Sequence, residues 1–281
     1  INRANTTIRI ATASTEVSDA ERAQYIAQAR FLRGHYYSEL KKMFNNVPWI
    51  DETVEKQAAV VNTVDIWPNI EADFKFAMDN LPNTQTDVGK ANKWAAASYL
   101  AKSYLYQKKF PEAKGIFDQV IAQGVTSNGL KYALVDKYKD NFDGATKNNA
   151  ESVFAVQAAA NDGTGTIDNA NAGQMLNFPY GDSPFGCCGF YQPTQDLVNS
   201  FRTDPATGLP FIDNYNAVAV KSDMNIASTS PFTPDNTSLD PRLDWTVGRR
   251  GLPYHDWGNH PGASWIRLQP YAGPYAPKKH I

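Results

Sequence analysis

The sequence predicts a mostly α-helical protein whose first half is regular and whose second half is rich in loops. Up to about residue 123, apolar residues recur every three or four positions, the spacing of one face of an α-helix. Beyond residue 151 this periodicity is largely lost, and Gly, Pro, Asn and aromatic residues become frequent. We therefore expect a helical region over residues 1–150 and a loop-rich region over residues 151–281, packed on the helical one.

Four helices are predicted in the first region, over residues 20–44, 64–81, 92–107 and 111–123. Asp65 is available as a cap for the second helix, and Pro82 follows its end. Pro111 suits the first turn of the fourth. The first helix carries an apolar stripe on one face, formed by Tyr25, Ala29, Leu32, Tyr36, Leu40 and Met43.

The third and fourth helices match the tetratricopeptide repeat, in which small residues let two antiparallel helices approach and large residues fill the gaps. Gly34 and Tyr37 repeat the spacing of Ala101 and Tyr104, so the helix over 20–44 is interpreted as part of a degenerate copy. The alternative is a set of ordinary helical hairpins. The predicted fold is a tetratricopeptide-like helical scaffold with a loop-rich cap that contains short strands. The matching residues are Leu100, Ala101, Tyr104, Phe110, Ala113, Phe117 and Val120.

Fewer regular elements are predicted in the second region. Residues 152–158 favour a short strand, and the Gly-, Asn- and Asp-rich segment 161–173 favours turns. A short helix is expected over 194–201. The last part of the chain concentrates aromatic residues, namely Trp245, Tyr254, Trp257, Trp265, Tyr271 and Tyr275.

Charge and hydropathy argue against a nucleic-acid partner and against a membrane-spanning helix. The net charge is only -2 over 281 residues, and Lys and Arg do not cluster into the basic stripe that follows a phosphate backbone, so no nucleic acid is expected. No apolar run approaches the roughly 18 residues of a membrane-spanning helix. The chain begins at Ile1 without an initiator methionine or a signal peptide, and we expect a processed chain or a fragment.

The only two cysteines, Cys187 and Cys188, are adjacent. They offer no spaced ligand set for zinc, and they are either two small buried residues or a vicinal disulfide. The sequence also lacks the nucleophile elbow, the H-E-x-x-H motif, the P-loop and the dinucleotide fingerprint, so no enzyme, cofactor or metal site is expected. A glycoside hydrolase stays open, because its carboxylate pair is defined by separation in space.

Three segments carry the mixture of aromatic rings and polar groups that binds sugars, whose C–H faces stack on rings and whose hydroxyls need hydrogen-bonding partners. Each has a structural alternative. Phe190 and Tyr191 could anchor their loop to the next helix, Trp49 could close a helix end, and the C-terminal rings could pack a loop-rich domain. The candidate ligand-binding residues are Trp49, Tyr180, Asp182, Phe185, Phe190, Tyr191, Tyr254 and Trp257.

Several segments, taken together, resemble the SusD/RagB family of nutrient-uptake proteins. They are INRAN at 1–5, ARFLRG at 29–34, NVP at 46–48, the repeat over 91–123 and GFYQPTQDLV at 189–198. Their order covers nearly the whole chain, and proteins of that family are longer at both ends.

The resemblance implies a non-catalytic lipoprotein on the surface of a Bacteroidetes-type outer membrane. Such a protein captures a nutrient, most often an oligosaccharide, and delivers it to a SusC-like TonB-dependent transporter. The resemblance also implies an N-terminal lipid anchor, whose cysteine is absent from this sequence. A peptide-binding RagB-like uptake protein is the first alternative, and a glycoside hydrolase is the second.

Overall fold

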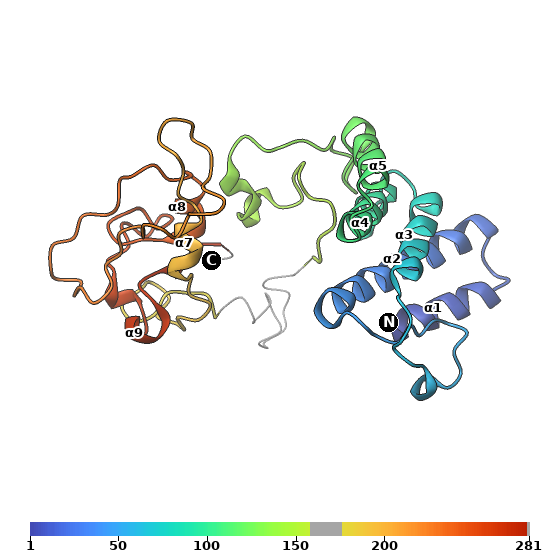
Figure 1. The fold of residues 1–281 in the computed structure, drawn as a ribbon. Helices are drawn as coiled ribbons and strands as arrows, with labels where there is room; N and C mark the ends of the chain where they lie inside the picture. Colours follow the sequence, from blue (N-terminus) through green and yellow to red (C-terminus); the bar gives the residue numbers. More distant parts are fainter. Residues whose placement is uncertain (158–175, 280–281) are drawn as a thin grey trace. The chain divides into compact units, whose positions relative to one another are not determined.

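The computed structural model describes residues 1–157 and 176–279, which form two compact units (Figure 1). The first unit comprises Ile1–Asp136 and Thr146–Gln157. The second comprises Lys137–Ala145 and Ala158–Ile281, of which 176–279 are described. Contacts thus assign residues 137–145 to the second unit, whereas the sequence placed them in the helical region. The segment 161–173, where turns were predicted, lies outside the described residues.

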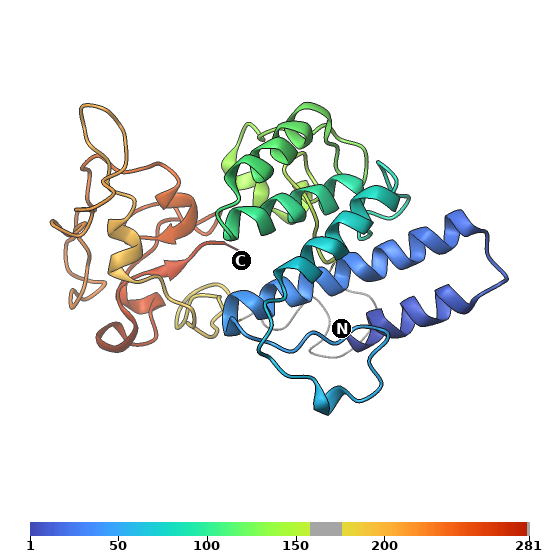
Figure 2. The same ribbon diagram turned by 45° about the vertical axis from the view of Figure 1, so that its right-hand side comes forward.

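The first unit is a succession of helices, each packed on the one before it (Figures 1 and 2). The mostly helical, tetratricopeptide-like scaffold predicted from the sequence is confirmed, and the four predicted helices correspond to α2 to α5. Helix α1 was not predicted. The helices are α1 (Asn2–Ala13), α2 (Asp19–Phe44), α3 (Trp67–Asn80), α4 (Lys93–Tyr106) and α5 (Phe110–Gln123), and a short 3-10 helix, η1 (Gln57–Ala59), lies between α2 and α3.

Local signals explain where these helices begin. Ser18 and Glu21 form a capping box at the start of α2, in which each side chain accepts a hydrogen bond from the backbone N–H of the other residue. The Asn92 side chain accepts a 2.8 Å hydrogen bond from the Ala95 N–H at the start of α4. Pro111 stands in the first turn of α5, where a missing N–H costs no helical hydrogen bond.

The core of the first unit lies between α2, α3 and α4. Phe31 packs edge-on against Phe74, with ring centroids 5.7 Å apart. Gly34 allows this approach, because a Cβ atom there would lie 3.1 Å from the Phe74 ring. Only part of the apolar stripe predicted on α2 is covered. Ala29 is buried and Leu40 packs against the core, whereas Tyr25 and Tyr36 are about half exposed and border an open groove.

The short strand predicted over 152–158 is absent, because described residues 152–157 form no ladder with any other segment. Instead, Phe154 inserts among aromatic rings of the first unit, 4.9 Å from the centroid of Phe31. An apolar run of this length can serve either as a strand or as an irregular segment that fills a core.

The second unit is built mainly of loops. Its strands β1 (Val247–Gly248) and β2 (Ala276–Pro277) pair antiparallel, with Val247 opposite Pro277 (Figure 2). The predicted helix over 194–201 is α7 (Gln195–Asn199), capped by the Thr194 hydroxyl. The remaining short elements are α8 (Leu243–Thr246), α9 (Gln269–Ala272) and the 3-10 helices η2 (Tyr138–Asn141), η3 (Gly144–Thr146) and η4 (Ala263–Trp265), of which η3 ends at a residue of the first unit.

Two apolar clusters stabilise the described part of the second unit. One surrounds Val198, Leu243 and Val247, and the other surrounds Tyr254 and Trp265. Helices of the described segments are all too short or too polar to cross a lipid bilayer.

Candidate functional site

The loop over residues 176–193 is held in shape by its own backbone. The N–H groups of Cys188 and Gly189 both donate to the carbonyl of Phe178, at 3.0 Å each. The Tyr180 N–H donates to the carbonyl of Trp265 at 2.9 Å, which fixes the loop to η4. Cys187 and Cys188 are joined as a vicinal disulfide, the second of the two possibilities that the sequence left open.

Three aromatic rings from two separate loops lie together in the second unit. The ring centroids of Phe178 and Phe185 are 4.5 Å apart, and that of Trp257 lies 6.3 Å from the first and 5.9 Å from the second. Their planes are inclined to one another by 28° at most. We call these three near-parallel rings the platform.

Tyr254 supports the platform from behind. It is completely buried, and its ring centroid lies 5.6 Å from that of Trp257. Its hydroxyl donates to the Pro277 carbonyl at 2.5 Å, and burial raises its pKa well above the ordinary value. Backbone hydrogen bonds between Tyr254 and both Trp257 and Gly258 close the turn that presents Trp257. The prediction that Tyr254 contacts a ligand is therefore corrected, because its ring is inaccessible.

The platform borders a cavity of about 680 Å³, which lies wholly within the second unit. Two more aromatic side chains, Phe142 and Trp245, contribute to its lining. Polar groups complete it, and they carry both signs of charge: Lys139, Asp143, His255, Asp256 and Lys278. The cavity thus combines aromatic surface with hydrogen-bond donors and acceptors, as small-molecule sites generally do.

Lys278 and His255 set the electrostatics of this cavity. The Lys278 ammonium group is nearly buried and donates to the carbonyls of Asp244, at 2.5 Å, and Pro253, at 2.9 Å. Burial lowers its pKa. Desolvation, assisted by the positive charge of Lys278, also lowers the pKa of His255 below its ordinary 6.5. The His255 imidazole is therefore mostly neutral at pH 7. One of its ring nitrogens bonds the Lys278 backbone, which leaves the other as a hydrogen-bond acceptor.

Lys279 ties the segment 137–145 to the C-terminal end of β2. Its Nζ donates to the Tyr138 hydroxyl at 2.8 Å and lies 4.4 Å from the centroid of the Phe142 ring. This contact places Phe142 and Lys139 in the lining of the cavity.

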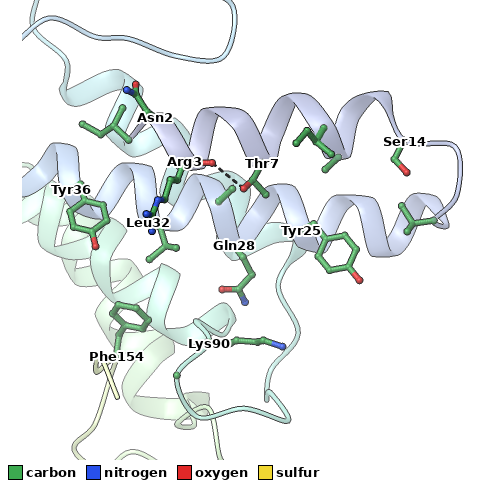
Figure 3. Close-up of a pocket in the computed structure, with 17 residues that line it drawn as sticks. Asn2, Arg3, Thr7, Ser14, Tyr25, Gln28, Leu32, Tyr36, Lys90 and Phe154 are labelled. Atoms are coloured by element: carbon green, nitrogen blue, oxygen red, sulfur yellow. Dashed lines mark hydrogen bonds between the residues drawn. The ribbon is translucent and has the colours of Figure 1, made fainter. Parts of the chain in front are cut away.

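A larger cavity, of about 1050 Å³, lies in the first unit beside α1 and α2 (Figure 3). In Figure 3, Tyr25, Gln28, Leu32 and Tyr36 point from α2 toward the side on which Phe154 lies. The amide of Gln28 is already engaged by the backbone of Ala91, at 2.6 and 3.2 Å. None of the eight predicted ligand-binding residues lines this cavity. The cavity beside the platform is thus the better candidate site.

The structure separates the predicted site residues into several groups. Phe185 and Trp257 line the candidate cavity. Tyr180 and Phe190 flank Arg267 outside it, and Asp182 and Tyr191 are exposed on the same loop. Trp49 belongs to the first unit, where its ring packs 4.3 Å from that of Tyr37.

Sequence reasoning missed several residues of the cavity. Phe178 stands in the same Gly- and Pro-rich stretch as Phe185. This position in the sequence was the one signal that could have identified Phe178. Trp245 was noted only as part of the aromatic C-terminal stretch. Phe142 and Lys278 join the site through contacts between distant segments, and no local pattern indicates them. Among the described residues, no three or more His, Cys, Asp or Glu side chains are grouped as metal ligands.

Comparison with known families gives two matches along the chain. Residues 1–105 match a SusD-like model described as starch-binding and associating with the outer membrane. Residues 150–273 match the model of the SusD family.

Two proteins with known sequences illustrate the relationship. A SusD-like protein of Bacteroides ovatus is 30% identical over 171 residues, which make up 56% of this chain and 31% of that protein. SusD-like protein P2 of Formosa agariphila is 33% identical over 93 residues, 31% of this chain and 18% of that protein. The chain thus aligns with less than a third of each relative's length.

Solved structures of low sequence identity share the fold. A SusD superfamily protein of Bacteroides vulgatus has a TM-score of 0.64 at 20% identity, covering 99% of this chain and 51% of the other. A laminarin-binding SusD-like protein has a TM-score of 0.61 at 21% identity, covering 92% of this chain and 59% of the other. Surface glycan-binding protein A of Bacteroides thetaiotaomicron, in complex with laminarihexaose, has a TM-score of 0.54 at 23% identity, covering 65% and 39%.

Proposed function

This chain belongs to the SusD-like family, and from that premise we propose that it is a non-catalytic protein that captures an oligosaccharide in the cavity beside the platform. The observation that carries the proposal is the platform itself. Its three near-parallel rings, Phe178, Phe185 and Trp257, border a cavity that also contains polar groups. Aromatic surface combined with a few placed polar groups suits the C–H faces and the hydroxyls of a sugar.

The polar groups around the platform suit a neutral sugar. Carboxylates such as Asp143 and Asp256 accept hydrogen bonds from hydroxyls, whereas Lys139 donates. His255, neutral at pH 7, accepts a hydrogen bond at the ring nitrogen that does not bond the Lys278 backbone. Because the lining contains two lysines and two aspartates, its charges balance and no strongly charged ligand is favoured.

The relatives support this proposal. One structure of the same fold is named as a laminarin-binding SusD-like protein, another is a glycan-binding protein in complex with laminarihexaose, and a third contains a xylogluco-oligosaccharide. Family membership further suggests that the full protein sits at the surface of an outer membrane. There it would hold its ligand for a SusC-like TonB-dependent transporter and be anchored through an N-terminal lipid.

Isothermal titration of the 281-residue chain with laminarihexaose and with a xyloglucan oligosaccharide tests the proposal. We expect saturable binding of at least one glycan, with the sugar recovered intact. Trp257→Ala should weaken that binding by about tenfold or more, since one lost stacking contact of about 1.4 kcal/mol has this effect. Tyr271→Ala is the matched control, because Tyr271 is 86% exposed and lies outside the cavity.

Two other outcomes would contradict the proposal. Binding of peptides alone, measured with the same chain and a set of peptides of varied charge, would indicate a RagB-like peptide carrier. Shortened glycan products would indicate a hydrolase that uses carboxylates of the cavity, since a carboxylate pair spaced about 5–9.5 Å apart is the requirement for glycoside hydrolysis.

A further inference from the structure

A second group of aromatic side chains lies outside the cavity, on the same loop that contributes to the platform. Tyr180 and Phe190 flank the guanidinium group of Arg267, whose Cζ lies 5.4 Å from the first ring centroid and 5.2 Å from the second. None of the three lines the cavity. We call this trio the arginine sandwich.

Backbone geometry fixes the arginine sandwich in place. Gly189 has a φ of +70°, and a Cβ atom there would lie 3.0 Å from the Cβ of Tyr180 and 3.1 Å from that of Arg267. Glycine at this position therefore lets the two side chains converge. The Arg267 Nη1 also donates to the Cys188 carbonyl at 3.2 Å, which holds the guanidinium against the loop.

The guanidinium group of Arg267 has the exposure and the hydrogen-bond donors needed to bind an anion. Its side chain is exposed, and no carboxylate of the described segments pairs with it. A guanidinium that stacks on rings keeps the N–H groups at its edge, where they match the oxygens of a carboxylate or a sulfate. Among the described residues, the hydrogen bond to the Cys188 carbonyl oxygen engages only one of its five N–H donors.

The flanking rings point to a sugar as the carrier of that anion. Tyr180 is 39% exposed and Phe190 is 46% exposed, so both keep apolar surface beside the guanidinium. The neighbouring Leu268 is 55% exposed and extends this surface. A pyranose ring that bears an acidic group brings a C–H face to the rings and an anion to the guanidinium, whereas a flexible acidic side chain brings only the anion.

We propose that the arginine sandwich is a second ligand-binding surface, which takes a sugar residue bearing a carboxylate or a sulfate group. This surface differs from the cavity in its charge. The cavity lining contains lysines and aspartates in equal number, whereas the sandwich presents one cation and two rings. The two surfaces therefore select different sugars, and the proposal does not depend on the ligand of the cavity.

The test is isothermal titration of the 281-residue chain with matched pairs of glycans. Hexagalacturonate is compared with its methyl ester, and sulfated laminarihexaose is compared with laminarihexaose, so that the carboxylate and the sulfate are examined separately. We expect at least one charged glycan to bind about tenfold more tightly than its neutral partner, as one charge-assisted hydrogen bond allows. The preference should shrink as salt is raised from low to high concentration.

Variants distinguish the sandwich from the cavity. Arg267→Gln should abolish the preference for the charged glycan, and Arg267→Lys should keep part of it, because lysine retains the charge but not the planar fork. Arg202→Gln is the matched control, since Arg202 also lies over a ring, that of Phe211, and bonds a carbonyl. Trp257→Ala should leave the preference unchanged even if it abolishes binding in the cavity. Thermal unfolding of each variant verifies that it folds.

Either of two results would overturn the inference. One is that Arg267→Gln, folded as the parent chain, binds the charged glycans as tightly as before. The other is that hexaglutamate binds as tightly as hexagalacturonate and with the same dependence on Arg267, which would make this surface a contact for acidic polypeptides instead.

Discussion

The ring of Phe178 lies 6.3 Å from the ring of Trp257, and the two planes are inclined by only 19°. The residues come from loops that are distant in sequence. Two backbone N–H groups bonded to the carbonyl of Phe178 fix one loop, and the turn closed by Tyr254 and Gly258 fixes the other. Their alignment is therefore imposed by backbone hydrogen bonds rather than by an element of regular secondary structure.

Replacing Phe178 with leucine separates ring stacking from simple burial. Phe178→Leu keeps an apolar side chain of similar reach but removes the flat face, so we expect glycan affinity to fall about fivefold to tenfold while thermal stability changes little. Titration of the glycan that the parent chain binds best measures the effect. Unchanged affinity would mean that the platform does not contact the sugar.

Removing the ammonium group of Lys279 should loosen the wall formed by residues 137–145. Lys279→Met loses the hydrogen bond to Tyr138 and the contact with the Phe142 ring, and we expect glycan affinity to fall about fivefold. Lys279→Arg should restore most of the affinity, because a guanidinium can make both contacts. If the Met variant binds as well as the parent chain, Phe142 and Lys139 have no part in recognition.

Breaking the buried ion pair between Arg33 and Asp73 should destabilise the first unit strongly. Two hydrogen bonds of 2.7 and 2.8 Å join the side chains, which are 3% and 0% exposed. Asp73→Asn removes the bidentate partner of Arg33, which keeps only the partly exposed Glu52, and it also removes the carboxylate that bonds Arg30. We expect the free energy of unfolding to fall by about 3 kcal/mol. Urea denaturation followed by tryptophan fluorescence measures it. Asp19→Asn, at an exposed ion pair with Arg22, should cost about 1 kcal/mol at most.

Acid should destabilise the second unit through His260. Burial, assisted by the positive charge of nearby Lys278, lowers the pKa of this histidine from 6.5 to about 4. Between these two values the unfolded chain binds a proton that the folded chain does not, so the stability that is complete above pH 6.5 is lost progressively as the pH falls toward 4. The loss is about 3 kcal/mol, from about 1.4 kcal/mol for each pKa unit.

Denaturation at pH 7 and pH 5 measures this dependence. His260→Gln removes the titrating group, and we expect the difference in stability between the two pH values to be smaller in this variant than in the parent chain. An equal difference in both proteins would assign the acid sensitivity to the carboxylates instead.

Local signals made much of the first unit predictable. The capping side chain of Asn92 and the early proline of α5 mark helix starts that the structure reproduces. They do not indicate which face of a helix is covered, and this is why the stripe through Tyr25 and Tyr36 proved to be half exposed. Helix α1 was not predicted because Ile1, at its N-terminus, provides no side-chain cap.

The candidate site was only partly predictable for a related reason. Phe185 and Trp257 were found because each stands in a loop where a large ring has no helix to pack into. Tyr254 has the same local context, yet it is completely buried. Whether a loop ring faces a ligand or the interior is decided by partners far along the chain, such as the Pro277 carbonyl that binds the Tyr254 hydroxyl.

Two adjacent lysines at the end of β2 hold different walls of the cavity. Lys278 draws together the carbonyls of Asp244 and Pro253, and Lys279 holds Tyr138. This arrangement determines the order in which the two units can become complete. While the chain is still being made, the helices of the first unit can already pack, but the cavity has no complete wall until residues 278 and 279 have left the ribosome. Ligand binding in this cavity is therefore possible only after residues 278 and 279 have been synthesised and have packed against the segments that they hold.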